Sequence, residues 1–128
     1  MGTRLAARTA LITGGSRGIG LAIAEAYAAE GCALALNARD GERLAKVADD
    51  LAARHGVPVR AFPCDVTERD AVFAMVAEVE AWRPLDILVN NAGIHVAARF
   101  VDYSFEDFKR IMEHNVYGVF HVTQAVLP

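Results

Sequence analysis

Residues 13–20 read Thr-Gly-Gly-Ser-Arg-Gly-Ile-Gly, and this stretch decides the fold. It follows a short apolar run at residues 9–12 and opens an alanine-rich helical pattern. A strand, a glycine turn and a helix in succession can hold a dinucleotide pyrophosphate, because the glycines let the backbone approach the phosphates and the helix start offers free N–H groups. The spacing is G-x-x-x-G-x-G rather than G-x-G-x-x-G, and the stretch alone also fits a plain strand–helix turn.

Strand and helix patterns alternate along the rest of the chain. We expect strands at residues 9–13, 33–37, 58–62 and 85–89, and helices at 18–30, 42–54 and 67–82, the last of these capped by Thr67. A long final helix is expected after a cap at Ser104. The first helix is expected to carry four side chains on one face, namely Ile19, Ile23, Ala26 and Tyr27. Such alternation predicts an α/β fold, a doubly wound parallel sheet with right-handed crossovers.

Composition narrows the function classes. The 128 residues suit one domain, and the net charge of −3 without a basic run argues against binding to nucleic acid or an anionic membrane. No apolar stretch approaches the ~18 residues of a membrane span. The two cysteines, Cys32 and Cys64, are expected to be reduced thiols of a cytoplasmic protein, although the sequence also allows a disulfide. The histidines show no metal-ligand spacing, and we expect no metal site; they are interpreted as structural or surface residues, with His95 as a lesser candidate for substrate contact.

Three further segments follow the glycine stretch: Cys-Asp-Val at 64–66, Asn-Asn-Ala-Gly at 90–93 and Asn-Val-Tyr-Gly at 115–118. Together, and in this order, the four segments resemble the short-chain dehydrogenase/reductase family, most closely its 3-oxoacyl carrier-protein reductases. The resemblance implies a Rossmann-like sheet of order 3-2-1-4 with further strands beyond the fourth. Residues 1–128 would then be the N-terminal portion of a single NAD(P)-binding Rossmann domain, truncated after the fourth strand and the following long helix.

The resemblance also implies a cofactor site. The pyrophosphate turn would comprise Gly14, Ser16, Arg17, Gly18, Ile19 and Gly20. Asp65 would accept a hydrogen bond from the adenine amino group and Val66 would contact the adenine ring, while the ribose on the nicotinamide side would lie against Asn91, Ala92 and Gly93. Each assignment has a plainer alternative: Arg17 as a solvated surface charge, Asp65 as a turn residue, and the two asparagines as part of an ordinary loop.

Residues 36–40, Leu-Asn-Ala-Arg-Asp, end the second strand and bear on the choice of cofactor. An acid at this strand end would bind the ribose 2′-OH of NAD, whereas an arginine accommodates the 2′-phosphate of NADP. By the resemblance the acid position holds Ala38 and the base position holds Arg39, with Arg17 as a second base. We therefore predict NADPH over NADH, and we interpret Asp40 as the N-cap of the next helix.

Catalysis in the family uses Ser, Tyr-x-x-x-Lys and Asn, and only the Asn has a match here, at Asn115, where it would hold a water of the proton relay. The tyrosines at 27, 103 and 117 are followed four residues on by Gly, Asp and His, and neither Ser16 nor Ser104 is in a matching position. We expect the complete protein to be an NADPH-dependent oxidoreductase that moves a hydride between nicotinamide and a carbonyl or secondary alcohol. These residues alone are expected to be inactive. The alternative is a non-catalytic NADP-binding module, or a truncated remnant acting by association.

The last helix pattern is apolar on more than one side, from Phe105 to Leu127. A helix of that kind is expected to be buried against several partners. The fourth strand would form an unpaired sheet edge, which also favours association. Together with the resemblance, this predicts a homo-oligomer, a dimer or tetramer, that contacts its neighbour through the last helix.

Overall fold

One parallel sheet organises residues 2–128, the part of the chain that the computed structural model describes. The elements in chain order are β1 (Thr9–Thr13), α1 (Gly18–Ala29), β2 (Ala33–Asn37), α2 (Gly41–His55), β3 (Val59–Ala61), α3 (Arg69–Trp82), β4 (Ile87–Val89), the short 3₁₀ turn η1 (Phe100–Asp102), α4 (Phe105–Met112), the π-helical segment η2 (Glu113–Tyr117) and α5 (Gly118–Val126). The strand order is β3-β2-β1-β4, all parallel, which confirms the predicted order and the α/β class.

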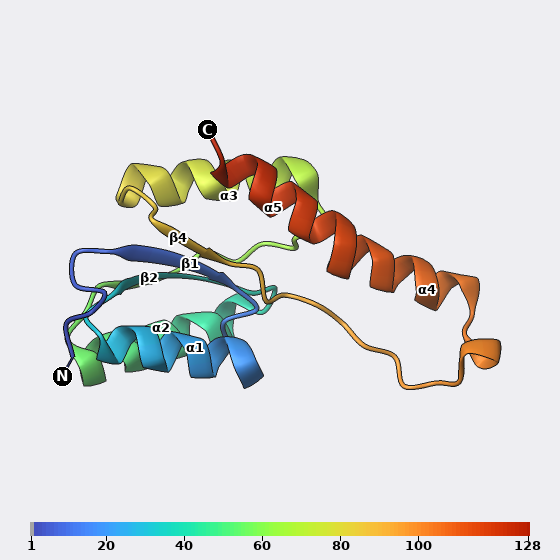
Figure 1. The fold of residues 1–128 in the computed structure, drawn as a ribbon, viewed down its shortest axis with the longest axis horizontal. Coiled ribbons are helices and arrows are strands. Elements are labelled where there is room, and N and C mark those ends of the chain that lie inside the picture. Colours follow the sequence, from blue (N-terminus) through green and yellow to red (C-terminus); the bar gives the residue numbers. More distant parts are fainter. Residues whose placement is uncertain (1) are drawn as a thin grey trace.

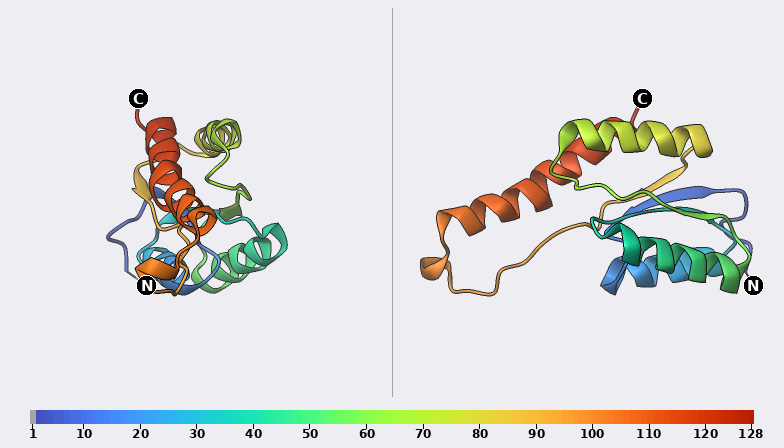
Figure 2. Two further views of the ribbon diagram at one scale, coloured as in Figure 1. Left: turned by 90° about the vertical axis from the view of Figure 1, so that its right-hand side faces the viewer. Right: turned by 180° about the vertical axis from the view of Figure 1, so that it is seen from behind.

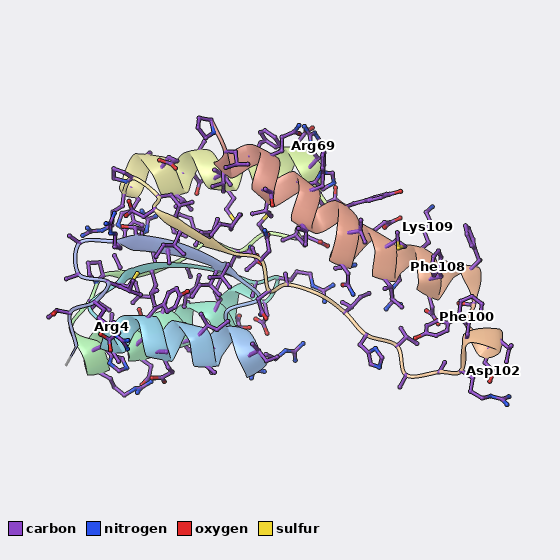
Figure 3. All side chains as sticks on the ribbon, viewed as in Figure 1. Arg4, Arg69, Phe100, Asp102, Phe108 and Lys109 are labelled. Atoms are coloured by element: carbon purple, nitrogen blue, oxygen red, sulfur yellow. The ribbon has the colours of Figure 1, made fainter. Side chains whose placement is uncertain are left out.

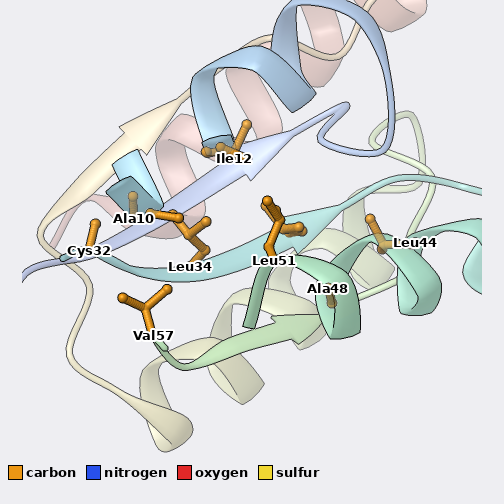
Figure 4. Packing of buried hydrophobic residues seen from close by; sticks show 11 residues of the cluster. Ala10, Ile12, Cys32, Leu34, Leu44, Ala48, Leu51 and Val57 are labelled. Carbon is orange, nitrogen blue, oxygen red and sulfur yellow. The ribbon is translucent and has the colours of Figure 1, made fainter. Parts of the chain in front are cut away.

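Helices cover both faces of the sheet, α1 and α2 one face and α3 and α5 the other (Figures 1 and 2). Every residue of β1 and β2 is buried, which fits their nearly continuous apolar runs, because a central parallel strand has no solvent-facing side. Under α1 and α2 the core includes Ile12, Leu34, Leu44 and Leu51 (Figure 4). The opposite core packs Leu11 with the inward side chains of α3.

The buried face of α1 differs from the predicted apolar face. The buried residues are Gly20, Ala24 and Ala28, whereas Ile19 is 73% exposed. Ala26 is exposed as well, while Ile23 and Tyr27 are half-buried beside the core. Small residues let the helix axis approach the sheet closely, so the helix turns its glycine and alanine stripe inward rather than its larger side chains.

The start of α3 also corrects a prediction. The helix begins at Arg69 with Glu68 as its N-cap residue, and Thr67 is not the cap. Instead, the Thr67 backbone N–H and hydroxyl both donate to Asp65 Oδ1, over 3.0 and 2.8 Å. α1 and α2 end within one residue of the predicted positions, and the chain leaves them through Gly31 and Gly56, which have φ angles of +86° and +66°.

The predicted long last helix is a helix in three parts. Ser104 caps α4 by accepting from the Asp107 N–H over 3.0 Å, as expected, but η2 then widens to π-helical hydrogen bonding before α5 begins. The α5 part lies on the sheet beside α3, whereas α4 projects away from it (Figure 1). Phe100, Phe108 and Lys109 lie on this projecting end (Figure 3).

Much of the projecting region is apolar and exposed. The exposed large side chains of this region include Phe100, Val101, Phe105 and Phe108, and further ones follow in η2 and α5, namely Val116, Tyr117, Phe120 and Leu127. β4, which pairs with β1, forms one edge of the sheet. Both cysteines are free thiols, as predicted. Within residues 2–128, no helix has both the length and the apolar content to cross a membrane.

Candidate functional site

The carboxyl ends of the four strands meet at one cavity of about 600 Å³. This is where ligands bind in open α/β sheets, and the volume lies in the usual range for small-molecule sites. Nine of the predicted site residues line the cavity: Gly14, Ser16, Arg17, Arg39, Asp65, Val66, Asn91, Ala92 and Gly93. Gly18, Ile19, Gly20 and Asn115 do not line it. The structure therefore brings together nine predicted residues that lie between positions 14 and 93 of the sequence.

The glycine turn places the start of α1 at the cavity. Gly14 and Gly18 have φ angles of +64° and +58°, which favour glycine, and the turn leads directly into the helix. A Cβ on Gly20 would lie 2.1 Å from the Gly14 carbonyl oxygen, so the first turn of α1 packs directly on the loop. The N-cap residue, Arg17, makes no side-chain cap bond, and the first turn carries no acid. The N–H groups and the positive end of the helix dipole are thus available to an anion.

Thr13, the last residue of β1, holds the two central loops together. Its hydroxyl oxygen accepts hydrogen bonds from the backbone N–H groups of Asn91 and Ala92, both over 2.9 Å. The Asn91 side-chain amide donates to the Gly14 carbonyl over 3.1 Å. The segment after β4 is thereby fixed against the glycine turn, with Thr13 2% exposed. The sequence prediction did not include Thr13, although a threonine directly before the glycines is a visible signal.

Asn37 plays the same part at the end of β2. Its side-chain amide donates to the carbonyls of Phe62 and Cys64, over 3.1 and 3.0 Å, and so links β2 to the segment after β3. Its backbone carbonyl accepts from the Gly15 N–H over 2.9 Å. The Oδ1 atom is buried and has no hydrogen-bond partner within residues 2–128. A buried acceptor without a partner costs free energy, and this one belongs to a residue that lines the cavity.

Three arginines line the cavity. Arg17 and Arg39 were predicted there, and Arg43 of α2 joins them, although the sequence analysis missed it. All three are exposed, and none has an ion-pair partner within 4.0 Å in the described part of the chain. Asp40 caps α2 by accepting from the Arg43 N–H over 3.1 Å, as predicted, so its carboxylate is engaged with the helix. The three arginines add positive charge to a cavity that the α1 N-terminus also faces, and two carboxylates, Asp40 and Asp65, line the same cavity.

Asp65 is both a turn residue and a residue of the cavity wall. Its Oδ1 atom accepts two hydrogen bonds from Thr67 and shapes the turn, while the residue also lines the cavity. Burial raises the pKa of the carboxyl, but hydrogen bonds from Thr67 and the attraction of His114 and Arg39 outweigh burial, so the pKa is lowered. Asp65 therefore lines the cavity as a carboxylate at neutral pH. The neighbouring Cys64 thiol has a pKa raised by burial and by the charges of Asp65 and Glu68, which keeps it protonated and a poor nucleophile.

His114 corrects the interpretation of the histidines as structural or surface residues. It lines the cavity, and its side chain is only 13% exposed. The Nε2 atom lies 3.9 Å from Asp65 Oδ1 and has no hydrogen-bond partner within the described residues. Little in the sequence points to this position, because a single histidine just before the Asn-Val-Tyr-Gly segment has no ligand-binding spacing to other histidines. Ile94 and Cys64 are further lining residues that the prediction missed.

Asn115 lies behind the cavity rather than in it. Its side-chain Oδ1 accepts from the Ile94 N–H over 2.8 Å and its Nδ2 donates to the Ile94 carbonyl over 2.9 Å. It belongs to the π-helical segment η2, where the ordinary helical hydrogen-bond pattern is interrupted. Asn90, the first residue after β4, donates through its side-chain amide to the Thr123 hydroxyl of α5 over 3.0 Å. Both asparagines fix the position of this segment.

Comparison with known proteins agrees with the fold. The family model described as short chain dehydrogenase matches residues 8–128. The chain belongs to this family. It is 42% identical over 123 residues to gluconate 5-dehydrogenase of Gluconobacter oxydans, covering 95% of this chain and 48% of that protein. It is also 40% identical over 121 residues to a 3-dehydrosphinganine reductase of Arabidopsis thaliana, covering 94% of this chain and 36% of that protein.

Solved structures give the same result. An alcohol dehydrogenase of the archaeon Thermococcus sibiricus, complexed with 5-hydroxy-NADP, matches with a TM-score of 0.90 and 39% identity over 93% of this chain and 51% of that chain. L-sorbose reductase of Gluconobacter frateurii, complexed with NADPH and L-sorbose, matches with a TM-score of 0.90 and 35% identity over 98% of this chain and 48% of that chain. The chain thus spans about half the length, or less, of these relatives. None of the four bears the name of a 3-oxoacyl carrier-protein reductase, and that subtype stays a prediction.

Proposed function

We propose that residues 1–128 are the N-terminal portion of an NADP-binding domain, and that the complete protein is an NADPH-dependent oxidoreductase acting on a small carbonyl compound or secondary alcohol. One observation carries the proposal: a single cavity joins an uncapped helix N-terminus to three unpaired arginines within the described chain, with an alanine where an NAD-selecting acid would be. The arginines supply positive charge for a 2′-phosphate, which NADP has and NAD lacks.

The residues present fit this cofactor along the length of the cavity. The start of α1 would receive the pyrophosphate, with Gly14, Ser16, Gly18, Ile19 and Gly20 forming the turn. Arg17, Arg39 and Arg43 would surround the 2′-phosphate. Asp65 and Val66 would hold the adenine, while Asn91, Ala92 and Gly93 would lie beside the ribose on the nicotinamide side. The complexes of two relatives with NADPH and 5-hydroxy-NADP support NADP as the ligand class.

The chemistry that bound NADPH supplies is transfer of a hydride to a carbonyl carbon, with a proton delivered to the oxygen to complete the alcohol. The residues of this chain would bind NADPH and orient its nicotinamide ring. Thr13 and Asn115 would hold the Asn91–Gly93 segment in place, and the cavity would fix the position of the nicotinamide. Asn115 would also contribute to the proton relay that the family resemblance implies, together with residues outside this chain.

Two further properties belong to the same proposal. The exposed apolar side chains of α4, η2 and α5 would be covered by the rest of the domain and by a second copy of the protein, which gives a homo-oligomer. The two free thiols, whose pKa values are both raised first of all by burial, fit the reducing environment of the cytoplasm.

The test is to titrate the full-length protein with NADPH and with NADH by isothermal calorimetry. NADPH oxidation is then followed with a panel of aldehydes, ketones and keto sugars. The proposal predicts tighter binding of NADPH than of NADH and turnover of at least one carbonyl class. NADPH binding without any turnover would favour the non-catalytic module instead. Absence of NADPH binding would contradict the proposed function as a whole.

A further inference from the structure

His114 presents a buried acceptor to the same space as Asp65. Its Nδ1 atom lies 3.0 Å from the Arg110 carbonyl oxygen, which can only accept a hydrogen bond. The proton of a neutral ring is therefore assigned to Nδ1, and Nε2 carries a lone pair. Nε2 has no partner within residues 2–128, and it lies 3.9 Å from Asp65 Oδ1 at the cavity wall.

With a neutral His114 ring, Nε2 and Asp65 Oδ1 are two acceptors that face each other without a hydrogen between them, which is unfavourable. Asp65 Oδ1 already accepts two hydrogen bonds from Thr67, and a carboxylate has no hydrogen to donate to Nε2. An unsatisfied buried nitrogen carries a desolvation cost, so the pair favours a ligand that brings donors. A nitrogen with two hydrogens, such as a primary aromatic amine, can donate one to each acceptor.

We propose that Asp65 and His114 together clamp the exocyclic amino group of the adenine of NADP, so that His114 is a specificity-determining residue for the base. The inference rests on the proposed function, because it takes the adenine end of the cavity to lie at Asp65 and Val66. What is new is the role of His114. A base with a carbonyl oxygen in place of the amino group would present a third acceptor to the pair and would be rejected.

Reduced nicotinamide hypoxanthine dinucleotide phosphate is the probe for this clamp. It differs from NADPH by an oxygen in place of the adenine amino group, with the matching change of protonation in the ring. Calorimetric titration of the full-length wild-type protein should show binding of NADPH about tenfold or more tighter than binding of the hypoxanthine analogue. This measurement needs no variant.

Substitution then separates His114 from Asp65. His114→Phe keeps a ring but removes both nitrogens, and it should weaken NADPH binding by roughly fivefold to tenfold while leaving the affinity for the hypoxanthine analogue equal or higher. His114→Gln places an amide oxygen near the position of Nε2 and should restore part of the discrimination. His95→Phe is the matched control, because His95 is exposed and outside the cavity, and it should leave both cofactor affinities unchanged.

The outcomes are distinguishable. If the wild-type protein binds NADPH but binds the analogue equally well, the clamp is overturned and the NADP site stands. The same holds if folded His114→Phe keeps the full discrimination, with folding checked by circular dichroism. If the wild-type protein binds neither compound, the proposed function fails and the clamp fails with it.

Discussion

Asn115 and Ile94 exchange two hydrogen bonds across 21 residues of sequence, in which the Asn115 side-chain amide pairs with both backbone polar groups of Ile94. The amide thus acts like a neighbouring strand and ties the segment after β4 to the π-helical turn. Because both ends of the side chain are engaged, the geometry supports a positioning role for it.

Replacement of Asn115 by leucine, which has a similar volume, should loosen this segment. Two hydrogen bonds are lost at a partly hydrated site, so the free energy of unfolding should fall by roughly 1–2 kcal/mol. Limited proteolysis within residues 94–103 should become faster. Asn90→Leu is the control, since it loses a single bond to Thr123 and leaves Ile94 paired. Unchanged cleavage in Asn115→Leu would contradict the positioning role.

Thr13→Val should be more damaging than its conservative shape suggests. The hydroxyl accepts from two backbone N–H groups, and valine would leave both without their partner in a residue that is 2% exposed. We expect a loss of about 2–4 kcal/mol in chemical denaturation, together with weaker NADPH binding because the Asn91–Ala92 segment shifts. Thr13→Ser keeps the oxygen and should retain most of the stability. Equal stability of the valine and serine variants would rule out this role of the hydroxyl.

Gly20→Ala tests the close approach of α1 to the glycine turn. The new Cβ would lie 2.1 Å from the Gly14 carbonyl oxygen, which forces the backbone to move, so a loss of about 1–3 kcal/mol or more is expected. Gly41→Ala is the matched control, because its Cβ would make ordinary contacts of 3.5 and 3.6 Å with Pro63. Thermal unfolding of the two variants provides the comparison, and similar melting temperatures would contradict the packing described here.

Asp65 should contribute to the pH dependence of stability. Burial raises the pKa of Asp65, but hydrogen bonds from Thr67 and the charges of His114 and Arg39 lower it overall from the ordinary value of 3.8. The carboxylate therefore stabilises the folded state above about pH 4. That contribution should disappear as the pH falls through the lower folded-state pKa. In urea unfolding, Asp65→Asn should be less stable than wild type at pH 7, and the difference should narrow below pH 4. A difference that stays constant down to pH 2 would exclude this origin.

The alternation of strand and helix patterns was sufficient to predict the α/β class, and the family resemblance of four short segments implied the strand order and most of the residues that line the cavity. The sequence was insufficient where side chains compete for one face. The exposure of Ile19 could not be read from periodicity, since the alanine and glycine stripe of α1 follows the same helical period as its larger residues.

The cavity residues that were not predicted, Arg43 and His114, were missed for a different reason. Arg43 and His114 reach the cavity from helices, and their direction depends on how α2 and the π-helical segment are placed against the sheet. A π-helical turn shifts every following side chain around the helix axis, which no regular period predicts. The role of Thr67 as a partner of Asp65, rather than a helix cap, likewise depends on the loop geometry after β3.

The most direct test of the account is the effect of Arg39→Ala on cofactor choice in calorimetric titrations of the full-length protein. A charge-assisted bond to the 2′-phosphate is worth about 1.5–3 kcal/mol, so the variant should bind NADPH roughly tenfold to a hundredfold more weakly while its affinity for NADH stays the same. Arg99→Ala, which removes an arginine outside the cavity, should change neither affinity. If Arg39→Ala leaves the affinity for NADPH unchanged, the assignment of this cavity to NADP through its arginines is wrong.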